Sequence, residues 1–134
     1  MQGLRIERLT IKSDQRGWLF EALRGDWLTP HNEFGQIHVS VAHPGKVRGN
    51  HYHTRKVEWF FVTTGTGRLV IKDRKSGETK EIFMGEKDPK SVRIPPGTLH
   101  AIKNVGNTQM VLIVYSVEPF DPDNPDTFFE RLLD

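Results

Sequence analysis

The stretch that decides the fold is GKVRGNHYHTRKVEWFFVTTG, residues 45–65. It places His51 and His53 one residue apart, so on an extended strand both imidazoles point to the same face. Glu58 stands directly before the apolar run WFFV, where burying a carboxylate without a partner would be costly. The pattern therefore predicts that a common partner holds the histidines and the carboxylate.

Outward from this stretch, short segments of alternating apolar and polar residues recur, broken by Gly, Pro, Asn or Asp. This spacing is typical of an all-β barrel or sandwich. We expect strands at residues 4–11, 17–23, 35–42, 46–53, 57–65, 67–73, 79–84, 91–95, 100–105 and 110–117. A hairpin turn is expected at residues 73–78, where Ser76-Gly77 supplies the positive φ that such loops need.

The C-terminal residues predict a single short helix, PDTFFERLLD, residues 125–134. Asn124 is a candidate N-cap, Pro125 would take the first helical position, and Asp126 would lie in the first turn.

The composition excludes several classes of protein. The chain has 134 residues, the length of one domain, and we expect a single domain over residues 1–134. Nineteen Lys and Arg against seventeen Asp and Glu are scattered, which argues against a nucleic acid or a membrane as partner. There is no cysteine, so a bound metal needs nitrogen and oxygen ligands. Neither a signal peptide nor a membrane span is recognisable, and the expected location is cytoplasmic.

Two spaced motifs carry a family resemblance. The first is Gly45-x5-His51-x-His53-x4-Glu58-x6-Gly65, and the second is Pro95-x-Gly97-x2-His100-x3-Asn104. With these motifs the chain resembles the cupin family, which implies a jelly-roll barrel, the double-stranded β-helix. One departure is that Pro89 replaces the glycine usually found six residues before the proline.

The cupin resemblance implies a divalent metal held by His51, His53, Glu58 and His100. Three imidazoles and a carboxylate suit zinc, which we favour, but also iron, manganese or nickel, and spacing does not choose among them. The alternative is a metal-free barrel that retains these polar residues for another reason.

The flanks of the first motif narrow the function. SDQRGWLFEALR, residues 13–24, and the segment leading to RGNHYH look like the N-terminal half of the nucleotide-sugar 3,5-epimerases. The resemblance implies a nucleoside-diphosphate sugar pocket near His51, with substrate-binding residues Arg16, Glu21, Gln36 and Arg48. Guanidinium groups can hold a diphosphate bidentately. Alternatively, Arg16 serves only a turn, and Glu21 pairs with Arg16 or Arg24 at the surface.

A closer resemblance covers the remaining sequence. Residues 49–73 and 94–129 look like the C-terminal cupin domain of bifunctional capsular polysaccharide synthesis enzymes. This implies a zinc cupin that epimerises C3 of a UDP-linked 4-keto-6-deoxy amino sugar, with a separate reductase as a further partner. His38 and His51 are the candidate catalytic residues; the base is either His38 or a metal-bound hydroxide, since a His51 bound to metal cannot also take a proton.

Two other hypotheses stay open: a different cupin enzyme, such as a ketoisomerase or an iron dioxygenase, and a non-catalytic sugar-nucleotide-binding module. We also expect a homodimer, because unpaired sheet edges favour association. Its contacts are expected at residues 4–11 or at Trp59 and Phe61.

Overall fold

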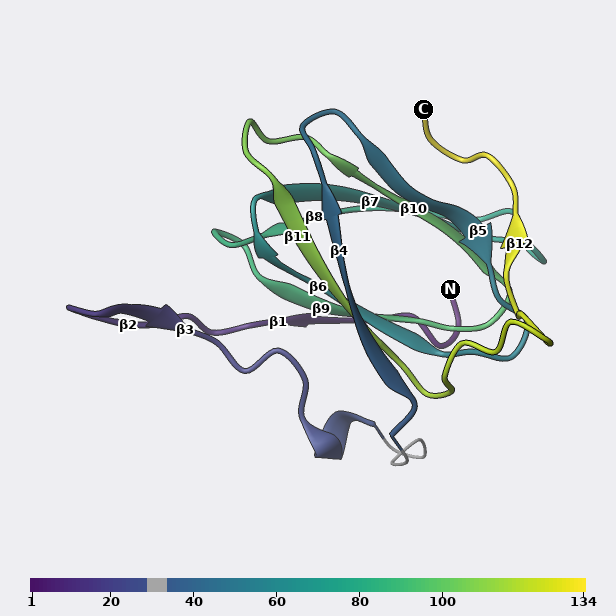
Figure 1. Ribbon diagram of the computed structural model, residues 1–134, viewed down its shortest axis with the longest axis horizontal. Coiled ribbons are helices and arrows are strands. Elements are labelled where there is room, and N and C mark those ends of the chain that lie inside the picture. Colours follow the sequence, from purple (N-terminus) through teal and green to yellow (C-terminus); the bar gives the residue numbers. More distant parts are fainter. Residues whose placement is uncertain (29–33) are drawn as a thin grey trace.

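The computed structural model describes residues 1–28 and 34–134, in which two five-stranded antiparallel sheets face each other (Figure 1). The strand order is β1-β9-β6-β11-β4 in one sheet and β12-β5-β10-β7-β8 in the other, and β2 and β3 form a separate hairpin. The strands are β1 (Arg5–Arg8), β2 (Lys12–Asp14), β3 (Gly17–Leu19), β4 (Gln36–Ala42), β5 (Val47–Tyr52), β6 (Glu58–Thr64), β7 (Thr66–Asp73), β8 (Thr79–Gly85), β9 (Lys90–Ile94), β10 (Thr98–Asn104), β11 (Met110–Ser116) and β12 (Phe128–Phe129). The expectation of an all-β fold is confirmed.

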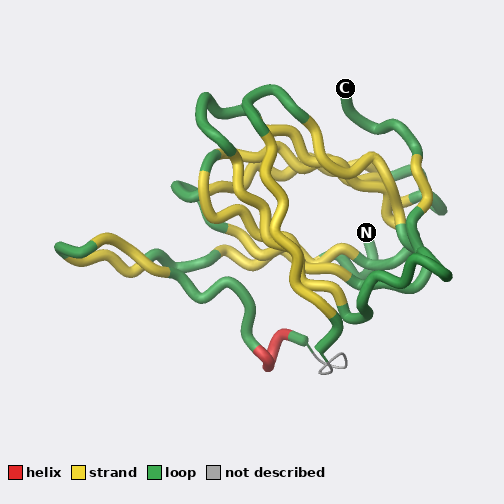
Figure 2. The backbone as a smooth tube through the Cα atoms, viewed as in Figure 1, coloured by secondary structure: helices red, strands yellow, loops and turns green. Residues whose placement is uncertain are grey.

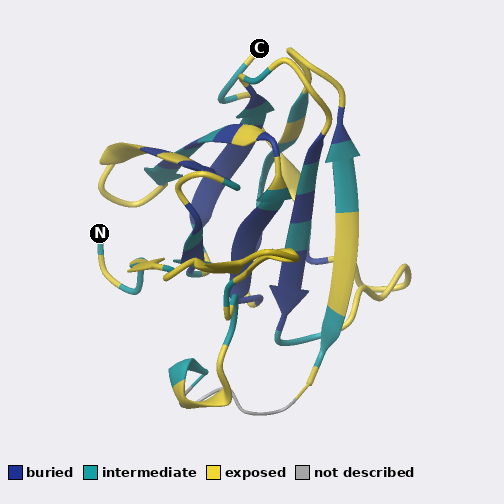
Figure 3. Ribbon diagram, turned by 90° about the vertical axis from the view of Figure 1, so that its left-hand side faces the viewer, coloured by how far each residue is buried: buried dark blue, intermediate teal, exposed yellow. Residues whose placement is uncertain are grey.

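The hydrophobic core lies between the two sheets. Alternate residues of each strand point inward, such as Leu69 and Ile71 of β7 and Ile102 of β10, which are all 0% exposed. Figure 3 shows this pattern as buried bands along the strands. Truncating one such side chain to Ala would cost about 2 to 5 kcal/mol of stability.

A second apolar cluster lies outside the core. Trp59 packs with Val57 and Tyr115, and Leu23 and Leu28 pack against it. β1 pairs with β9 along one side only, and as the end strand of its sheet it keeps an unpaired edge and mostly exposed residues. Trp59 and Phe61 are only 3% and 8% exposed within the single chain. The expected contact at Trp59 and Phe61 is therefore largely covered within one chain, whereas the edge of β1 stays available and the homodimer stays a prediction.

The turn at residues 73–78 is confirmed, with Gly77 at φ +79° between β7 and β8. The strand expected at residues 17–23 is shorter. Only β3 forms, and it pairs with β2 in a hairpin that extends away from the two sheets (Figure 2).

The predicted C-terminal helix is wrong. Phe128 and Phe129 form β12, which pairs with β5 through Tyr52 and His51. An isolated helix of this length is marginal in water, whereas Asn50 bonds the backbone of residues 132 and 133 in the extended form. The one helical element in the described ranges is a 3-10 turn, η1 (Gly25–Trp27), and no helix there has the length and apolar content to cross a membrane.

Candidate metal and ligand site

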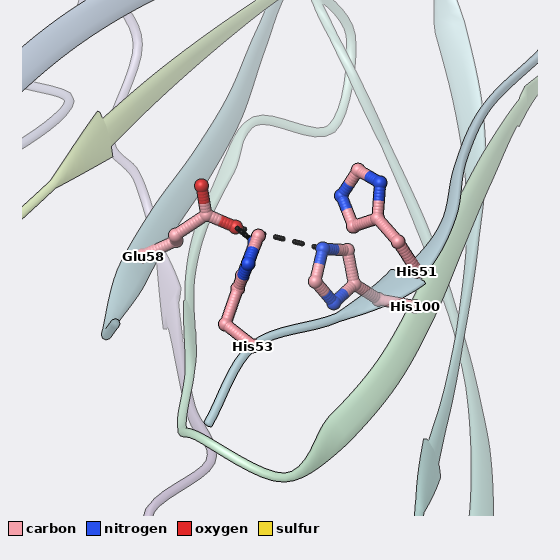
Figure 4. Close-up of side chains that lie close together, drawn as sticks. All are labelled: His51, His53, Glu58 and His100. Carbon is pink, nitrogen blue, oxygen red and sulfur yellow. Dashed lines mark hydrogen bonds and ion pairs between the residues drawn. The ribbon is translucent and has the colours of Figure 1, made fainter. Parts of the chain in front are cut away.

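Four side chains converge between the sheets (Figure 4). His51 and His100 lie opposite each other on β5 and β10, His53 follows β5, and Glu58 opens β6 in the other sheet. One ligand atom from each residue lies within 4.8 Å of the others. His53, Glu58 and His100 are buried. The four residues that the two motifs predicted as metal ligands therefore meet at one point.

A left-handed backbone aims His51 at the cluster. Gly49 has φ +99° and Asn50 has φ +59°. A Cβ on Gly49 would lie 2.8 Å from the backbone oxygen of His100, so this close approach of β5 to β10 requires glycine. Asn50 is a residue type that tolerates the left-handed region, and its side chain is tied to Leu133 and to the amide of Leu132.

The hydrogen bonds of two imidazoles fix their tautomers. His100 Nδ1 donates to the backbone oxygen of Thr98 at 2.9 Å, so its Nε2 carries a lone pair. His53 Nδ1 donates to the backbone oxygen of Asp126, so His53 Nε2 faces Glu58 with a lone pair when the ring is neutral and with a proton when the ring is charged. Both Nε2 atoms point toward Oε1 of Glu58, at 3.0 Å from His53 and 3.5 Å from His100.

This arrangement fits a cation. Two nitrogen lone pairs and a carboxylate oxygen are all acceptors, and acceptors repel each other unless a proton or a metal lies between them. His100 Nε2 is buried without a hydrogen-bond partner, the kind of polar atom that otherwise costs stability. His and carboxylate ligands are those that zinc and related divalent ions accept. The cluster could therefore bind a metal ion.

The ionisation states favour the same conclusion. Burial raises the pKa of Glu58, but the contacts with His100 and His53 outweigh it and hold this pKa well below its ordinary range. Burial, and then the charges of His100 and His53, lower the pKa of His51 to about 4. For His53 burial lowers the pKa, but Glu58 outweighs it, so the net shift is upward.

Asp126 holds the segment between the ligands. Its carboxylate accepts hydrogen bonds from the amides of Thr54, Arg55 and Lys56 and from the Thr54 hydroxyl, at 2.6 to 3.0 Å. Its backbone oxygen accepts from His53. Asp126 is 1% exposed. The sequence suggested only a residue of a helical first turn here, and no local signal marked its role.

A cavity of about 430 Å³ adjoins the cluster. Gln36 and His38 of β4 line it, as expected from the sequence, and so does Arg48. Arg48 donates from Nε and Nη2 to the backbone oxygen of Val41, at 3.0 and 2.7 Å. Side chains that the sequence analysis missed also line the cavity, namely Ser40, Lys56, Phe60, Phe120, Thr127 and Phe129.

Residues 12–128 match the family described as polysaccharide biosynthesis C-terminal domain. The chain belongs to this family. The spore coat polysaccharide biosynthesis protein SpsL of Bacillus subtilis is 33% identical over 132 residues, which cover 94% of this chain and 86% of SpsL. The capsular polysaccharide assembling protein CapF of Staphylococcus aureus has 35% identity and a TM-score of 0.71. The matched region covers 92% of this chain and 34% of CapF.

The fold of this polysaccharide biosynthesis family member is that of the cupins. RmlC of Legionella pneumophila, a dTDP-6-deoxy-D-glucose-3,5-epimerase in complex with dTDP-4-keto-L-rhamnose, has a TM-score of 0.84. The comparison covers 100% of this chain and 76% of RmlC at 19% identity, a level that establishes the fold alone. The resemblance to epimerase-type cupins is thereby confirmed.

Two predicted residues of this family member lie away from the cavity. Arg16 is on the projecting β2–β3 hairpin, 90% exposed, and pairs with Asp14. Glu21 pairs with Arg24 at 3.0 Å, which is one of the surface alternatives considered above. Neither lines the cavity. Gln36, His38 and Arg48 line the cavity, and the functional role of all five residues stays a prediction.

Proposed function

We propose that this polysaccharide biosynthesis cupin is a C3 epimerase of a UDP-linked 4-keto-6-deoxy amino sugar. The single observation that carries the proposal is the His/Glu cluster beside a cavity of about 430 Å³. The family assignment supports the polysaccharide context, since SpsL and CapF are named for spore coat and capsular polysaccharide. The proposal includes a homodimer in the cytoplasm and a separate reductase for the ketone.

The cofactor of the proposal is one divalent ion, zinc in preference to iron, manganese or nickel. His51, His53, Glu58 and His100 would hold it. When bound, it supplies Lewis acidity that makes a proton next to a carbonyl easier to remove.

The reaction removes one proton from C3 and adds another. The C3–H bond breaks, its electron pair forms a double bond between C3 and C4, and the carbonyl π pair moves to the C4 oxygen. Solvent water then protonates C3 on the opposite face as the C4 carbonyl re-forms, and the hydroxide left behind takes the proton held by the base. His38 on β4 lines the cavity and is the proposed base. His51 is the poorer candidate, because its lone pair belongs to the metal cluster.

Arg48 and Gln36 are the proposed substrate contacts within one chain. Both line the cavity. Arg48 uses two N–H groups on Val41, and its guanidinium has five, so others remain for a diphosphate oxygen. Gln36 Oε1 accepts from the amide of Phe120 at 2.7 Å, which fixes the loop that borders the cavity.

Isotope exchange tests the proposal. The zinc-loaded protein is incubated in D2O with a UDP-4-keto-6-deoxy-N-acetylhexosamine, and NMR follows the signal of the C3 proton. Loss of this signal, together with the appearance of the C3 epimer, is the expected result. Glu58→Gln should abolish the exchange. Substrate binding without exchange in the wild type would instead support the non-catalytic binding module.

A further inference from the structure

A small pocket of about 100 Å³ lies on the outer face of the sheet that contains β6. Residues of β1, β6, β9 and the turn η1 line it. Trp59 in its wall follows Glu58 on β6, and successive side chains of a strand point to opposite faces of the sheet. The sheet therefore separates this pocket from the cavity beside the His/Glu cluster.

The Ser91 hydroxyl lines this pocket and, among the described residues, has no hydrogen-bond partner. Ser91 is 1% exposed, and burying a hydroxyl without a hydrogen bond costs free energy. In the described ranges, the other buried side-chain atom without a partner is Nε2 of His100, which belongs to the His/Glu cluster. A ligand oxygen that accepts a hydrogen bond from Ser91 would remove this cost.

Two arginines of neighbouring strands also meet at this pocket. Arg5 of β1 is directly opposite Arg93 of β9, and like charges in this position destabilise a sheet. Within residues 1–28 and 34–134, neither guanidinium has a carboxylate within 4.0 Å. Burial, and then the charge of Arg5, lower the pKa of Arg93. Arg93 is held in place, because it donates to the backbone oxygen of Gly3 at 2.6 Å and lies over the Trp59 ring.

The charges around the pocket favour a ligand with a single negative charge. Asp26 lines the pocket, but both of its carboxylate oxygens accept hydrogen bonds from Arg24. Glu7, opposite Ser91 in the pairing of β1 with β9, offsets one of the two pocket guanidiniums. One positive charge therefore remains for a ligand, and the Glu7 carboxylate would repel a doubly charged anion.

We propose that this pocket binds a small carboxylate through Arg5, Arg93 and Ser91. The two carboxylate oxygens accept N–H groups of the two guanidiniums, and one oxygen also accepts from the Ser91 hydroxyl. Guanidinium and carboxylate groups match each other in geometry and form strong paired hydrogen bonds. Trp27 and Trp59 give an apolar wall to the carbon end of the ligand, and the volume limits this end to a few carbon atoms.

Indole N–H signals in NMR spectra test this site, because the tryptophans report on two places. Trp27 and Trp59 line the pocket, and Trp18 on the projecting β2–β3 hairpin is an internal control. When propionate replaces chloride at constant ionic strength, the Trp27 and Trp59 signals should shift to saturation and that of Trp18 should stay in place. Phosphate, which is mostly doubly charged at about pH 8, should bind more weakly than propionate.

Three variants separate a built site from nonspecific binding. Arg5→Ala should weaken propionate binding about tenfold or more, as expected for one charged hydrogen bond, and Ser91→Ala should also weaken it. Ser91→Ala should keep its fold, since it removes a buried hydroxyl that has no partner among the described residues. Arg8→Ala changes a side chain that is 82% exposed on the same strand as Arg5 and should match the wild type. Equal affinity in all four proteins, or no saturable shift of the two pocket signals, would overturn the proposal.

Light scattering of the same samples distinguishes two sources of the carboxylate. A molar mass that stays constant as propionate binds supports a free ligand, as proposed. A molar mass that falls as the two signals shift would show that propionate displaces a carboxylate of a second copy, and would overturn the assignment to a free ligand. Neither measurement uses a sugar substrate, so the result is independent of the C3 exchange experiment.

Discussion

The ring of His53 donates from Nδ1 to the backbone oxygen of Asp126, 73 residues further along the chain. The carboxylate of the same aspartate binds the amides of the three residues that follow His53. One residue thus sets both the tautomer of a candidate metal ligand and the course of the chain toward Glu58. Partners of this kind normally tune metal affinity.

Replacing Asp126 by Ala should weaken both stability and metal binding. Three amides, one buried and two partly buried, would lose their acceptor, so we expect the free energy of unfolding to fall by about 3 kcal/mol. Zinc affinity should fall about 10- to 100-fold because the segment after His53 is no longer held. Urea unfolding and competition with a chelator measure the two effects. Asp123→Ala, in the exposed part of the same loop, is the control and should change neither.

Asp126 should also contribute to sensitivity to acid. Burial raises its pKa, but the hydrogen bonds from Thr54 to Lys56 outweigh it and lower the pKa to about 2, from an ordinary value of 3.8. The stabilisation is therefore present above about pH 4 and is lost as the pH falls toward 2, on the order of 2 kcal/mol in all. Urea unfolding of the metal-free protein at about pH 5 and about pH 3 should show a smaller difference for Asp126→Asn than for the wild type. Equal differences would contradict this contribution.

The metal content should depend on the four clustered ligands. The purified wild type should retain roughly one divalent ion per chain, and His51→Ala or His100→Ala should release it, because each removes one of the four donors. Elemental analysis after gel filtration gives the stoichiometry. His43→Ala changes an exposed histidine outside the cluster and should retain the ion. Full metal content in both ligand variants would rule out this site.

Arg48 should act on the ligand and not on the metal. Arg48→Ala removes a cavity guanidinium, and we expect UDP-sugar binding to weaken about tenfold or more, as for one charged hydrogen bond. Calorimetry measures the affinity, and zinc content should stay at the wild-type value. Arg131→Ala, whose side chain is 82% exposed, provides the matched control. A loss of zinc in Arg48→Ala would show that the two functions are not separable.

Light scattering tests the predicted homodimer at micromolar concentration. The outer positions Ile37 and Val39 of β4 are 55% and 61% exposed, and β4 is an edge strand. We expect them to lie in the contact, since exposed apolar edges associate. The double variant Ile37→Lys with Val39→Lys should be monomeric, with an unchanged circular dichroism spectrum. A monomeric wild type would contradict the predicted homodimer.

The convergence of the cluster could be predicted because strand periodicity determines which residues share a face. His51 and His53 are two residues apart, and the second motif supplied His100. Gln36, which the resemblance to the epimerases implied, and His38 both lie on the cavity side of β4. The shared face of His51 and His53 needed only strand geometry, whereas His100 came from the cupin motif and Gln36 from the resemblance to the epimerases.

The positions of the other site residues could not be predicted, because they depend on contacts between residues that are distant in sequence. Asp126 after Asn-Pro is typical of a helix start, where a carboxylate serves nearby amides, but in the fold it serves amides 70 to 72 residues earlier. Lys56 was inconspicuous because a single lysine in a strand connection usually faces water. Arg16 was predicted to bind substrate because it matches a family motif. A motif does not show in which direction the β2–β3 hairpin that carries Arg16 extends.

The late position of Asp126 has a consequence for biosynthesis. All four candidate ligands are synthesised by residue 100, but the aspartate that fixes His53 leaves the ribosome 26 residues later. Because translation is vectorial and slow relative to local folding, a nascent barrel has its donors before it has the group that orients them. A fully ordered site therefore forms only after Asp126 has emerged, later than the four candidate ligands themselves.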